Sequence, residues 1–171
     1  MSRTYPGVRL FVVLTVALFA GLPATAAHAD SELRVELEAY RVTTDAEGSE
    51  QFSIAKAAYP GDVVEYRAHY TNDGLQTLTN VQAVLPIPKN TIYLPATAMP
   101  AHVEASLDGE TYEAVPLRRR VVNADGTESF ELVPASEYRF LRFGLGDLGA
   151  DATALAKARV AIPTNTAATN R

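Results

Sequence analysis

The sequence predicts an all-β protein, and three features of its pattern favour an antiparallel β-sandwich. Short runs in which apolar and polar residues alternate recur between Leu33 and Ile162, and a period of two is typical of strands with one buried face. Turn-forming sequences such as Pro60-Gly61-Asp62 and Asn72-Asp73-Gly74 separate these runs, because proline, glycine and asparagine stabilise tight turns. Only one segment, 150–159, has a composition that also suits a helix. Many short strands joined by tight turns are typical of a sandwich.

The first part of the chain has the features of a secretory signal peptide. Arg3 and Arg9 precede an apolar run from Leu10 to Leu22, and the small-residue sequence Ala27-His28-Ala29 follows it. A charged start, an apolar middle and an A-x-A end are typical of a cleaved signal. The apolar run is shorter than the roughly 20 residues that a membrane-spanning helix needs. An uncleaved membrane anchor is the alternative.

We expect cleavage between Ala29 and Asp30, which divides the chain into three parts. Residues 1–29 are the signal peptide, residues 30–163 form the β-sandwich domain, and the polar stretch 164–171 is predicted to be a disordered tail. No later segment is apolar enough to cross a bilayer. The mature chain is therefore expected to be exported without a transmembrane anchor, to the periplasm, the cell surface or the medium.

Composition and charge exclude several classes of function. The chain of 171 residues has a net charge of −5, and removal of the signal peptide takes away two arginines and no acid, which leaves −7. Nucleic-acid binding normally needs a clustered basic surface, so this balance argues against it. The chain contains no cysteine, which excludes disulfides, thiolate zinc sites, cysteine nucleophiles and a lipid-acceptor cysteine.

Alternation is clearest in Val63–Tyr70 and Leu33–Glu38. In the first segment one face is expected to be buried and the other to face solvent; the buried face carries Val64, Tyr66, Ala68 and Tyr70, and the solvent face carries Glu65, Arg67 and His69. Further strands are predicted over Phe52–Ala57, Val81–Leu85, Thr91–Leu94, Val103–Leu107, Tyr112–Val115, Arg118–Val122, Ser129–Val133, Arg139–Phe143 and Ala156–Ile162.

Two further features concern turns and the one candidate helix. Asp108-Gly109 and Asp125-Gly126 lie between alternating runs, and Asp-Gly supplies the backbone angles of tight hairpins. The stretch Ala150–Arg159 is rich in alanine and other good helix formers. Its second half nevertheless alternates into Ile162, which favours a closing strand over a helix.

A resemblance to a known family follows from the central motifs. The motifs lie between roughly residues 55 and 162 and are Pro60-Gly61-Asp62, then Val64-x-Tyr66-x-x-x-Tyr70-x-Asn72-x-Gly74, Leu78-x-Asn80-Val81, Leu85-Pro86-Ile87-Pro88, Thr91-Ile92-Tyr93-Leu94-Pro95 and the closing stretch Leu141 to Ala150. Over this range the chain resembles a bacterial conserved-repeat surface domain, catalogued as domain of unknown function number eleven. The resemblance implies an immunoglobulin-like sandwich on an exported or cell-surface protein.

The family motif assigns structural roles to Tyr66, Tyr70, Asn72 and Gly74. Asn72 and Gly74 fall at the end of a strand, where residues that tolerate a left-handed backbone are favoured. Tyr66 and Tyr70 are expected to point into the core while each hydroxyl reaches a carbonyl at its rim. These are folding roles and name no ligand.

Residues with catalytic or ligand-binding chemistry are few and scattered. Gly144–Gly149 matches G-x-G-x-x-G, but a dinucleotide site needs a following helix and strand that the remaining residues do not supply. His69 and His102 lie in no local cluster with other metal ligands, so neither metal binding nor catalysis is expected of them. Glu36 and Glu38 share one face of a strand and are expected to be solvated.

The triplet Arg118-Arg119-Arg120 is the one notable charge cluster. Its favoured interpretation is an edge strand protected by charge against the addition of another strand. The functional alternative is contact with an anionic polymer of the cell envelope.

Together these features predict an exported, non-enzymatic β-sandwich module of the bacterial cell envelope, with no cofactor and no metal. It would act as a structural, adhesive or partner-binding component, and its partner would be an envelope protein or polymer. Two alternatives stay open: a periplasmic ligand-binding or chaperone-like accessory subunit, and a hydrolase whose site combines distant residues such as His69 or His102 with acids.

The signal peptide can be tested directly. The exported protein is expected to begin at Asp30, as measured by mass spectrometry of its N-terminal peptide. Ala29→Lys should leave the precursor uncleaved, because the cleavage site needs a small residue there. His28→Ala, at the tolerant position between the two alanines, should be processed normally. An exported protein that retains residues 1–29 would contradict the prediction.

Overall fold

A computed structural model describes residues 32–164 of the chain. The predicted signal peptide, its cleavage site at Ala29 and Asp30, and residues 165–171 of the predicted tail lie outside the described residues. The described part contains eleven strands and one short 3₁₀ helix. In chain order these are β1 (Leu33–Thr44), β2 (Glu50–Ile54), β3 (Val63–Asn72), β4 (Leu78–Pro86), β5 (Ile92–Tyr93), β6 (Val103–Ser106), β7 (Glu113–Ala114), β8 (Arg118–Val122), β9 (Glu128–Leu132), η1 (Ala135–Glu137), β10 (Phe140–Leu148) and β11 (Thr153–Ala161).

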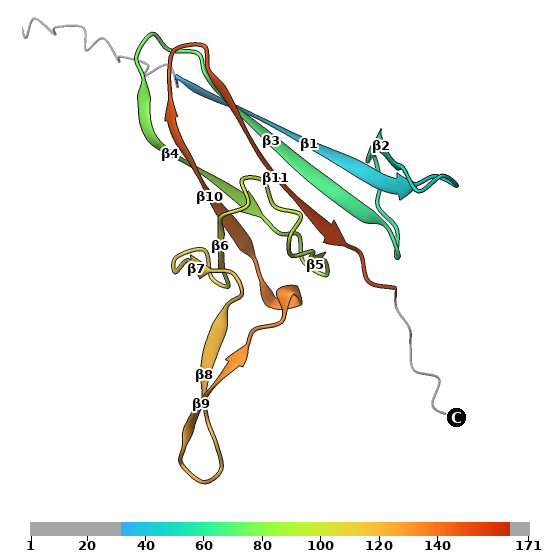
Figure 1. The fold of residues 1–171 in the computed structure, drawn as a ribbon, viewed down its shortest axis with the longest axis vertical. Helices are drawn as coiled ribbons and strands as arrows, with labels where there is room; N and C mark the ends of the chain where they lie inside the picture. Colours follow the sequence, from blue (N-terminus) through green and yellow to red (C-terminus); the bar gives the residue numbers. More distant parts are fainter. Residues whose placement is uncertain (1–31, 165–171) are drawn as a thin grey trace, which may run out of the picture. The chain divides into compact units, whose positions relative to one another are not determined.

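The strands form two packed antiparallel sheets and a separate hairpin (Figure 1). One sheet has the strand order β2-β1-β3-β11-β5, and the other has the order β4-β10-β6-β7. Contacts of β3 with β4 and of β10 with β11 join the two layers. The strands β8 and β9 pair only with each other. The expected β-sandwich is confirmed.

The core lies between the two sheets and is built from aromatic and small residues. Tyr93, Tyr138, Leu141 and Phe143 are at most 2 % exposed, and the rings of the two tyrosines stack with centroids 6.1 Å apart. Alanines at inward positions, including Ala83, Ala105, Ala156 and Ala158, are also fully buried. Alternating large and small side chains let two sheets interdigitate at close packing density without a tryptophan or disulfide.

The observed strands agree with the sequence pattern, and several are longer than expected. β1 runs to Thr44 because its last five residues pair with β2. β10 continues through its glycines to Leu148, with irregular register at Gly144 and Gly146 where it pairs with β4. The glycine-rich motif is therefore part of a bulged strand, and glycine at position 146 has a φ of 74°. The stretch that also suited a helix is β11, so tertiary pairing overrides its helix propensity.

Candidate functional site

Asn72 is the most heavily hydrogen-bonded of the four side chains for which the sequence predicts a structural role. It ends β3 and is completely buried. Its amide donates to the carbonyl oxygens of Gln76, Leu148 and Gly149 at 2.7–3.0 Å, and its side-chain oxygen accepts from the Gly74 amide at 3.0 Å. One side chain thus ties the turn after β3 to the turn between β10 and β11, which is a structural role.

The other motif residues also serve the fold, partly for reasons that differ from those expected. Neither Asn72 nor Gly74 has a positive φ, so the expected left-handed backbone does not explain them. A Cβ on Gly74 would lie 2.8 Å from the side chain of Glu32, so close approach explains the glycine. Tyr66 is partly buried against the core. Tyr70 is 7 % exposed; burial raises the pKa of its phenol, and a backbone hydrogen bond from Val84 opposes part of that rise.

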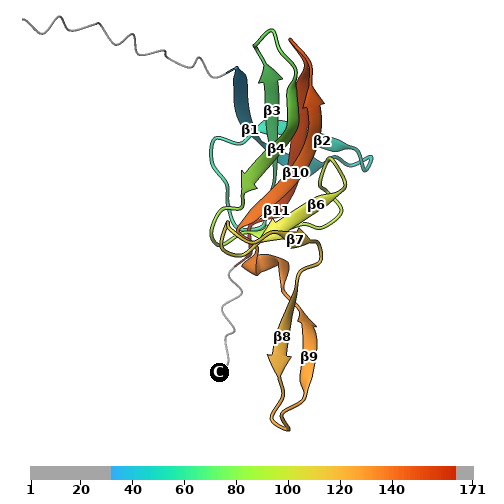
Figure 2. The ribbon, with the colours of Figure 1, turned by 90° about the vertical axis from the view of Figure 1, so that its left-hand side faces the viewer.

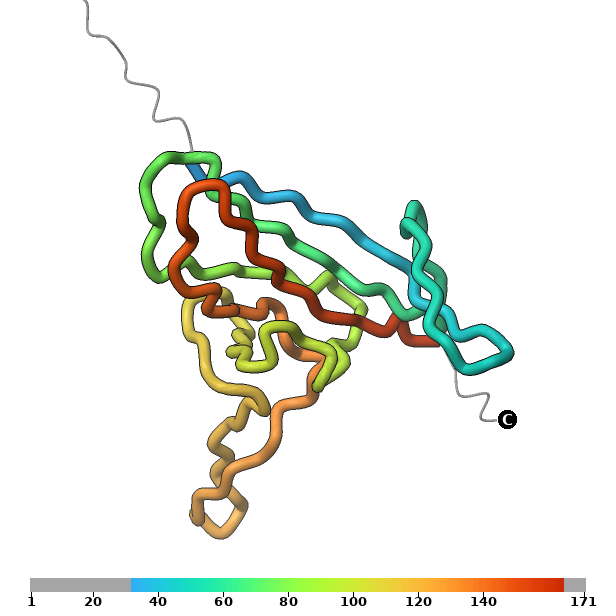
Figure 3. The backbone as a smooth tube through the Cα atoms, turned by 45° about the horizontal axis from the view of Figure 1, so that its top comes forward, coloured from blue at the N-terminus to red at the C-terminus, as the bar shows by residue number. Residues whose placement is uncertain are grey.

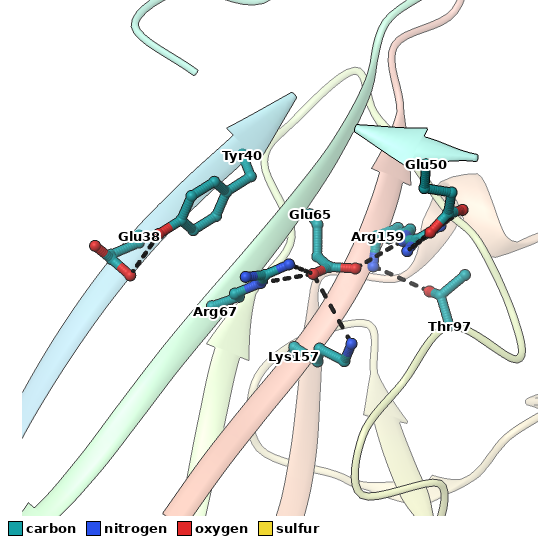
Figure 4. A network of polar contacts seen from close by, with 8 residues as sticks. All are labelled: Glu38, Tyr40, Glu50, Glu65, Arg67, Thr97, Lys157 and Arg159. Atoms are coloured by element: carbon teal, nitrogen blue, oxygen red, sulfur yellow. Dashed lines mark hydrogen bonds and ion pairs between the residues drawn. The ribbon is translucent and has the colours of Figure 1, made fainter. Parts of the chain in front are cut away.

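The sequence prediction for Glu65 is wrong. Strand parity places it on the outer face of the five-stranded sheet, as expected, but its exposed fraction is 0 %. Figure 4 shows the cations that surround its carboxylate: Arg67 approaches to 2.6 Å, Arg159 to 2.7 Å and Lys157 to 3.9 Å. Arg159 also binds both carboxylate oxygens of Glu50.

Glu65 is buried because two other segments cover the outer face of its strand. Although β2 pairs with β1, its Glu50 reaches Arg159 on β11, and its Phe52 ring lies 4.7 Å from the Arg67 guanidinium. The segment that carries β2 therefore folds back over the sheet (Figure 3). On the other side the hydroxyl of Thr97 accepts a hydrogen bond from the Arg159 amide. Arg67 is enclosed by Phe52 and by Tyr40, whose ring centroid is 4.5 Å away.

The electrostatics of this cluster favour structure over catalysis. Burial alone would raise the pKa of Glu65, but hydrogen bonds from Arg159 and Arg67 and the charge of Lys157 outweigh it, so the pKa is lowered. Glu50 and Glu65 in turn raise the pKa of Arg159. A carboxylate whose pKa is lowered in this way is a poor general base, because it binds a proton weakly near neutral pH.

The two histidines lie in different elements, and strand register places one of them, His69, opposite Glu36 of β1. His69 lies on the outer face of β3, and His102 is exposed in the loop before β6. Residues 32–164 contain no group of three or more side chains arranged to hold a metal ion. In the same part of the chain no helix has the length and apolar character needed to cross a bilayer.

The arginine triplet lies on the β8–β9 hairpin, which extends away from both sheets (Figures 1 and 2). Among the described strands β8 pairs only with β9, so it is an edge strand, as the favoured sequence interpretation predicted, but of this two-stranded ribbon and not of the sandwich sheets. Arg119 pairs with Glu137 at 2.9 Å, and Arg120 pairs with Glu128 at 3.0 Å. Two of the three arginines are thus neutralised within the chain, which weakens the case for contact with an anionic polymer.

One face of this hairpin, which we call the hairpin face, carries exposed apolar side chains. Its apolar members are Val122, Phe130 and Leu132, which are 65 %, 72 % and 63 % exposed. Strand register places Phe130 opposite Arg120 and Leu132 opposite Arg118, so these arginines share the face. The sequence signal was the alternation in Ser129–Val133, which predicted a half-buried strand; only the structure shows that no second layer covers it.

A groove of about 570 Å³ forms a second surface feature, beside the core. Its walls come from the loops around β5, β6 and β7 and from the segment that precedes β8. The lining is mainly apolar and includes Tyr93, Ala98, Val103, Val115, Pro116 and Tyr138, with His102 at its side. No local sequence pattern predicts this groove, because its lining residues come from separate segments of the chain.

Comparison with protein-family models, with curated proteins and with solved structures gave no match for this chain. Its class is therefore defined by its architecture: it is an all-β protein with two packed antiparallel sheets of five and four strands.

Replacement of Asn72 should destabilise the protein strongly. Asn72→Ala leaves three carbonyl oxygens without their amide donor, and we expect a loss of about 3 kcal/mol in the free energy of unfolding, measured by urea denaturation. Thr71→Ala is the matched control, because the Thr71 side chain forms a hydrogen bond with the Thr153 hydroxyl at the surface. This variant should lower the free energy of unfolding by less than about 0.5 kcal/mol. Equal effects of the two variants would contradict the role of Asn72.

Glu65 should contribute stability that depends on pH. Its folded pKa lies below the ordinary carboxyl value, so its contribution is complete above about pH 4.3 and is lost as the pH falls through the folded pKa. Glu65→Gln should cost about 3 kcal/mol at pH 7, because the partly buried Arg67, Lys157 and Arg159 lose the counter-charge that they share. It should also flatten the decline in stability below pH 4.3. Urea denaturation at several pH values measures both effects, with the exposed Glu131→Gln as control; an unchanged pH slope would refute the assignment.

Proposed function

We propose that this protein is an exported, non-enzymatic β-sandwich module of the bacterial cell envelope that works by contact, with the hairpin face as its contact element. The observation that carries the proposal is the exposure of Val122, Phe130 and Leu132, each above 60 %, on one face of a hairpin that the sheets do not cover. Large apolar side chains grouped in this way mark interaction surfaces more often than isolated ones do.

The chemistry of the hairpin face suits binding to a protein. A buried aromatic ring and an arginine are the residue types that most often dominate binding energy at interfaces. Phe130 provides the ring, and Arg118 provides a guanidinium directly opposite Leu132. The other two arginines of the triplet are paired with acids, Arg119 with Glu137 and Arg120 with Glu128. A partner with an apolar patch and a carboxylate near it would complement this surface.

Two features of the sequence support an envelope location for this contact. The N-terminal segment has the pattern of a secretory signal. The central motifs around Tyr66, Tyr70, Asn72 and Gly74 resemble a conserved-repeat domain of bacterial surface proteins, for which an immunoglobulin-like sandwich and a binding or structural role are expected. Two observations support a non-enzymatic role. His69 and His102 lie in different elements, and the Glu65 carboxylate is paired with Arg67 and Arg159.

A second candidate function is that of a periplasmic ligand-binding or chaperone-like accessory subunit. The observation that favours it is the apolar groove of about 570 Å³ beside Tyr93 and Tyr138. Its volume lies in the range of small-molecule sites. This candidate places the contact in the groove and leaves the hairpin face without a role.

Site-specific photo-cross-linking in the native host distinguishes these functions. Phe130→benzoylphenylalanine is expected to give one discrete adduct on irradiation, because Phe130 lies at the centre of the proposed contact. Glu131→benzoylphenylalanine, on the opposite face of the same strand, is the matched control and should give little or none. The Leu132→Ser variant should reduce the adduct from position 130.

Absence of an adduct from position 130, or equal adducts from positions 130 and 131, would overturn the proposed contact. A small ligand bound in the groove would also leave position 130 without an adduct. Far-ultraviolet circular dichroism and urea denaturation of each variant show whether the sandwich is intact. Hairpin changes are expected to alter the stability of the sandwich little, because Val122, Phe130 and Leu132 are each more than 60 % exposed.

A further inference from the structure

The first half of β1 forms an uncovered edge of the five-stranded sheet in the described part of the chain. β2 pairs with β1 only over Tyr40–Thr44, while β3 pairs with β1 along the opposite side from Leu33 to Val42. Among the described residues no strand covers the side of β1 occupied by Arg34–Glu38. We call this stretch the β1 edge. An uncovered edge presents backbone groups that are suited to pairing with another strand.

The direction of the backbone groups along this edge follows from two hydrogen bonds. The Ala39 carbonyl accepts from the Ala55 amide, so it points toward the β2 side, whereas the Glu32 carbonyl accepts from the Asp73 amide on the β3 side. Backbone groups alternate along a strand, and β1 keeps a continuous register with β3. Both amides and carbonyls of Val35 and Leu37 therefore point away from β3, toward open space.

The side chains of the β1 edge are divided between two faces. Val35 and Leu37 lie opposite Tyr70 and Ala68 of β3, so they share the inner face of the five-stranded sheet. They are nevertheless 50 % and 54 % exposed, because the four-stranded sheet ends at β4, which lies over β3. The inner face of β1 thus extends past the four-stranded sheet. Val35 and Leu37 form an apolar strip there that this sheet does not cover.

The outer face of the same stretch carries Arg34, Glu36 and Glu38. In an antiparallel pair centred on Glu36, Arg34 of one chain lies opposite Glu38 of the other, and this contact occurs twice. Oppositely charged residues directly across two strands stabilise the pair. The same register places Val35 opposite Leu37 on the inner face, also twice. The Glu36 carboxylates face each other across the axis, and each is already bonded by Arg34 of its own chain.

The edge of the other sheet is protected in ways that the β1 edge is not. β4 contains Asn80 with a φ of 52° and ends in Pro86, and both features interrupt strand pairing. The phenol of Tyr70 also forms a hydrogen bond with the Val84 backbone. The β1 edge has no proline and no positive φ. Antiparallel pairing brings Arg34 opposite Glu38 of a second copy, and each of the two facing Glu36 carboxylates is bonded by Arg34 of its own chain.

We propose that two copies of this chain associate through antiparallel pairing of their β1 edges about a two-fold axis at Glu36. Val35 and Leu37 of each chain exchange backbone hydrogen bonds with Leu37 and Val35 of the other. The two five-stranded sheets join into one continuous sheet, and the two apolar strips cover each other on its inner face. A symmetric interface of this kind closes on itself and yields a dimer.

Sedimentation equilibrium of the purified protein tests the dimer. The protein is expected to show a reversible monomer–dimer equilibrium. Val35→Pro removes an edge amide that points away from β3, and Leu37→Lys places a charge in the apolar strip. Each should weaken dimerisation by about tenfold or more, which corresponds to about 1.4 kcal/mol. Ile54→Lys, at an equally exposed apolar residue of β2, is the matched control and should leave the equilibrium unchanged.

A charge exchange tests the pairing itself. Glu38→Arg should weaken the dimer, and Arg34→Glu combined with Glu38→Arg should restore it, because opposite charges again face each other. A Phe130→Ser and Leu132→Ser double variant should dimerise normally, which separates this interface from the proposed hairpin contact. A protein that stays monomeric up to about 1 mM (a limit near −4.1 kcal/mol), or β1 variants that dimerise like the native chain, would overturn the proposal. Circular dichroism and urea denaturation confirm that each variant is folded.

Discussion

The carboxylate of Glu65 is the constraint on which much of the described structure depends. A charge removed from water is stable only when it is paired and hydrogen-bonded. Arg67 on the same strand, Arg159 on β11 and the nearby Lys157 supply this compensation, and Glu50 of β2 balances Arg159 from outside. The cluster joins three strands of one sheet through charges that would be costly to separate, and it fixes the position of the β2 segment over the sheet.

The position of β2 has a consequence for the rest of the surface. After Ile54 the chain turns back to begin β3, and Arg41 holds this return through the Ala57 carbonyl and through Asp62. β2 therefore pairs with only the last part of β1 and leaves Arg34–Glu38 uncovered. The same fold-back that buries Glu65 exposes the β1 edge. The position of β2 therefore accounts both for the burial of Glu65 and for the uncovered β1 edge.

The surfaces proposed for binding differ in kind from the sites that sequence motifs reveal. The motif residues Tyr66, Tyr70, Asn72 and Gly74 could be found from the sequence because turns and buried polar groups restrict residue choice locally. All four lie within the fold or at its turns. The hairpin face and the β1 edge could not be found in this way. Phe130 and Val35 alternate with polar neighbours as core residues do, and only the extent of the opposite layer decides whether they are covered.

The sequence by itself determined the all-β class, the main strands from β1 to β11 and the hairpin turns, because these depend on local periodicity and turn chemistry. Tertiary structure alone decided that Glu65 is buried, that β8 and β9 leave the sandwich, and that half of β1 lies beyond the second sheet. Strand parity assigns a side chain to a face but carries no information about what lies against that face. Contacts between residues as distant as Glu50 and Arg159 supply that information.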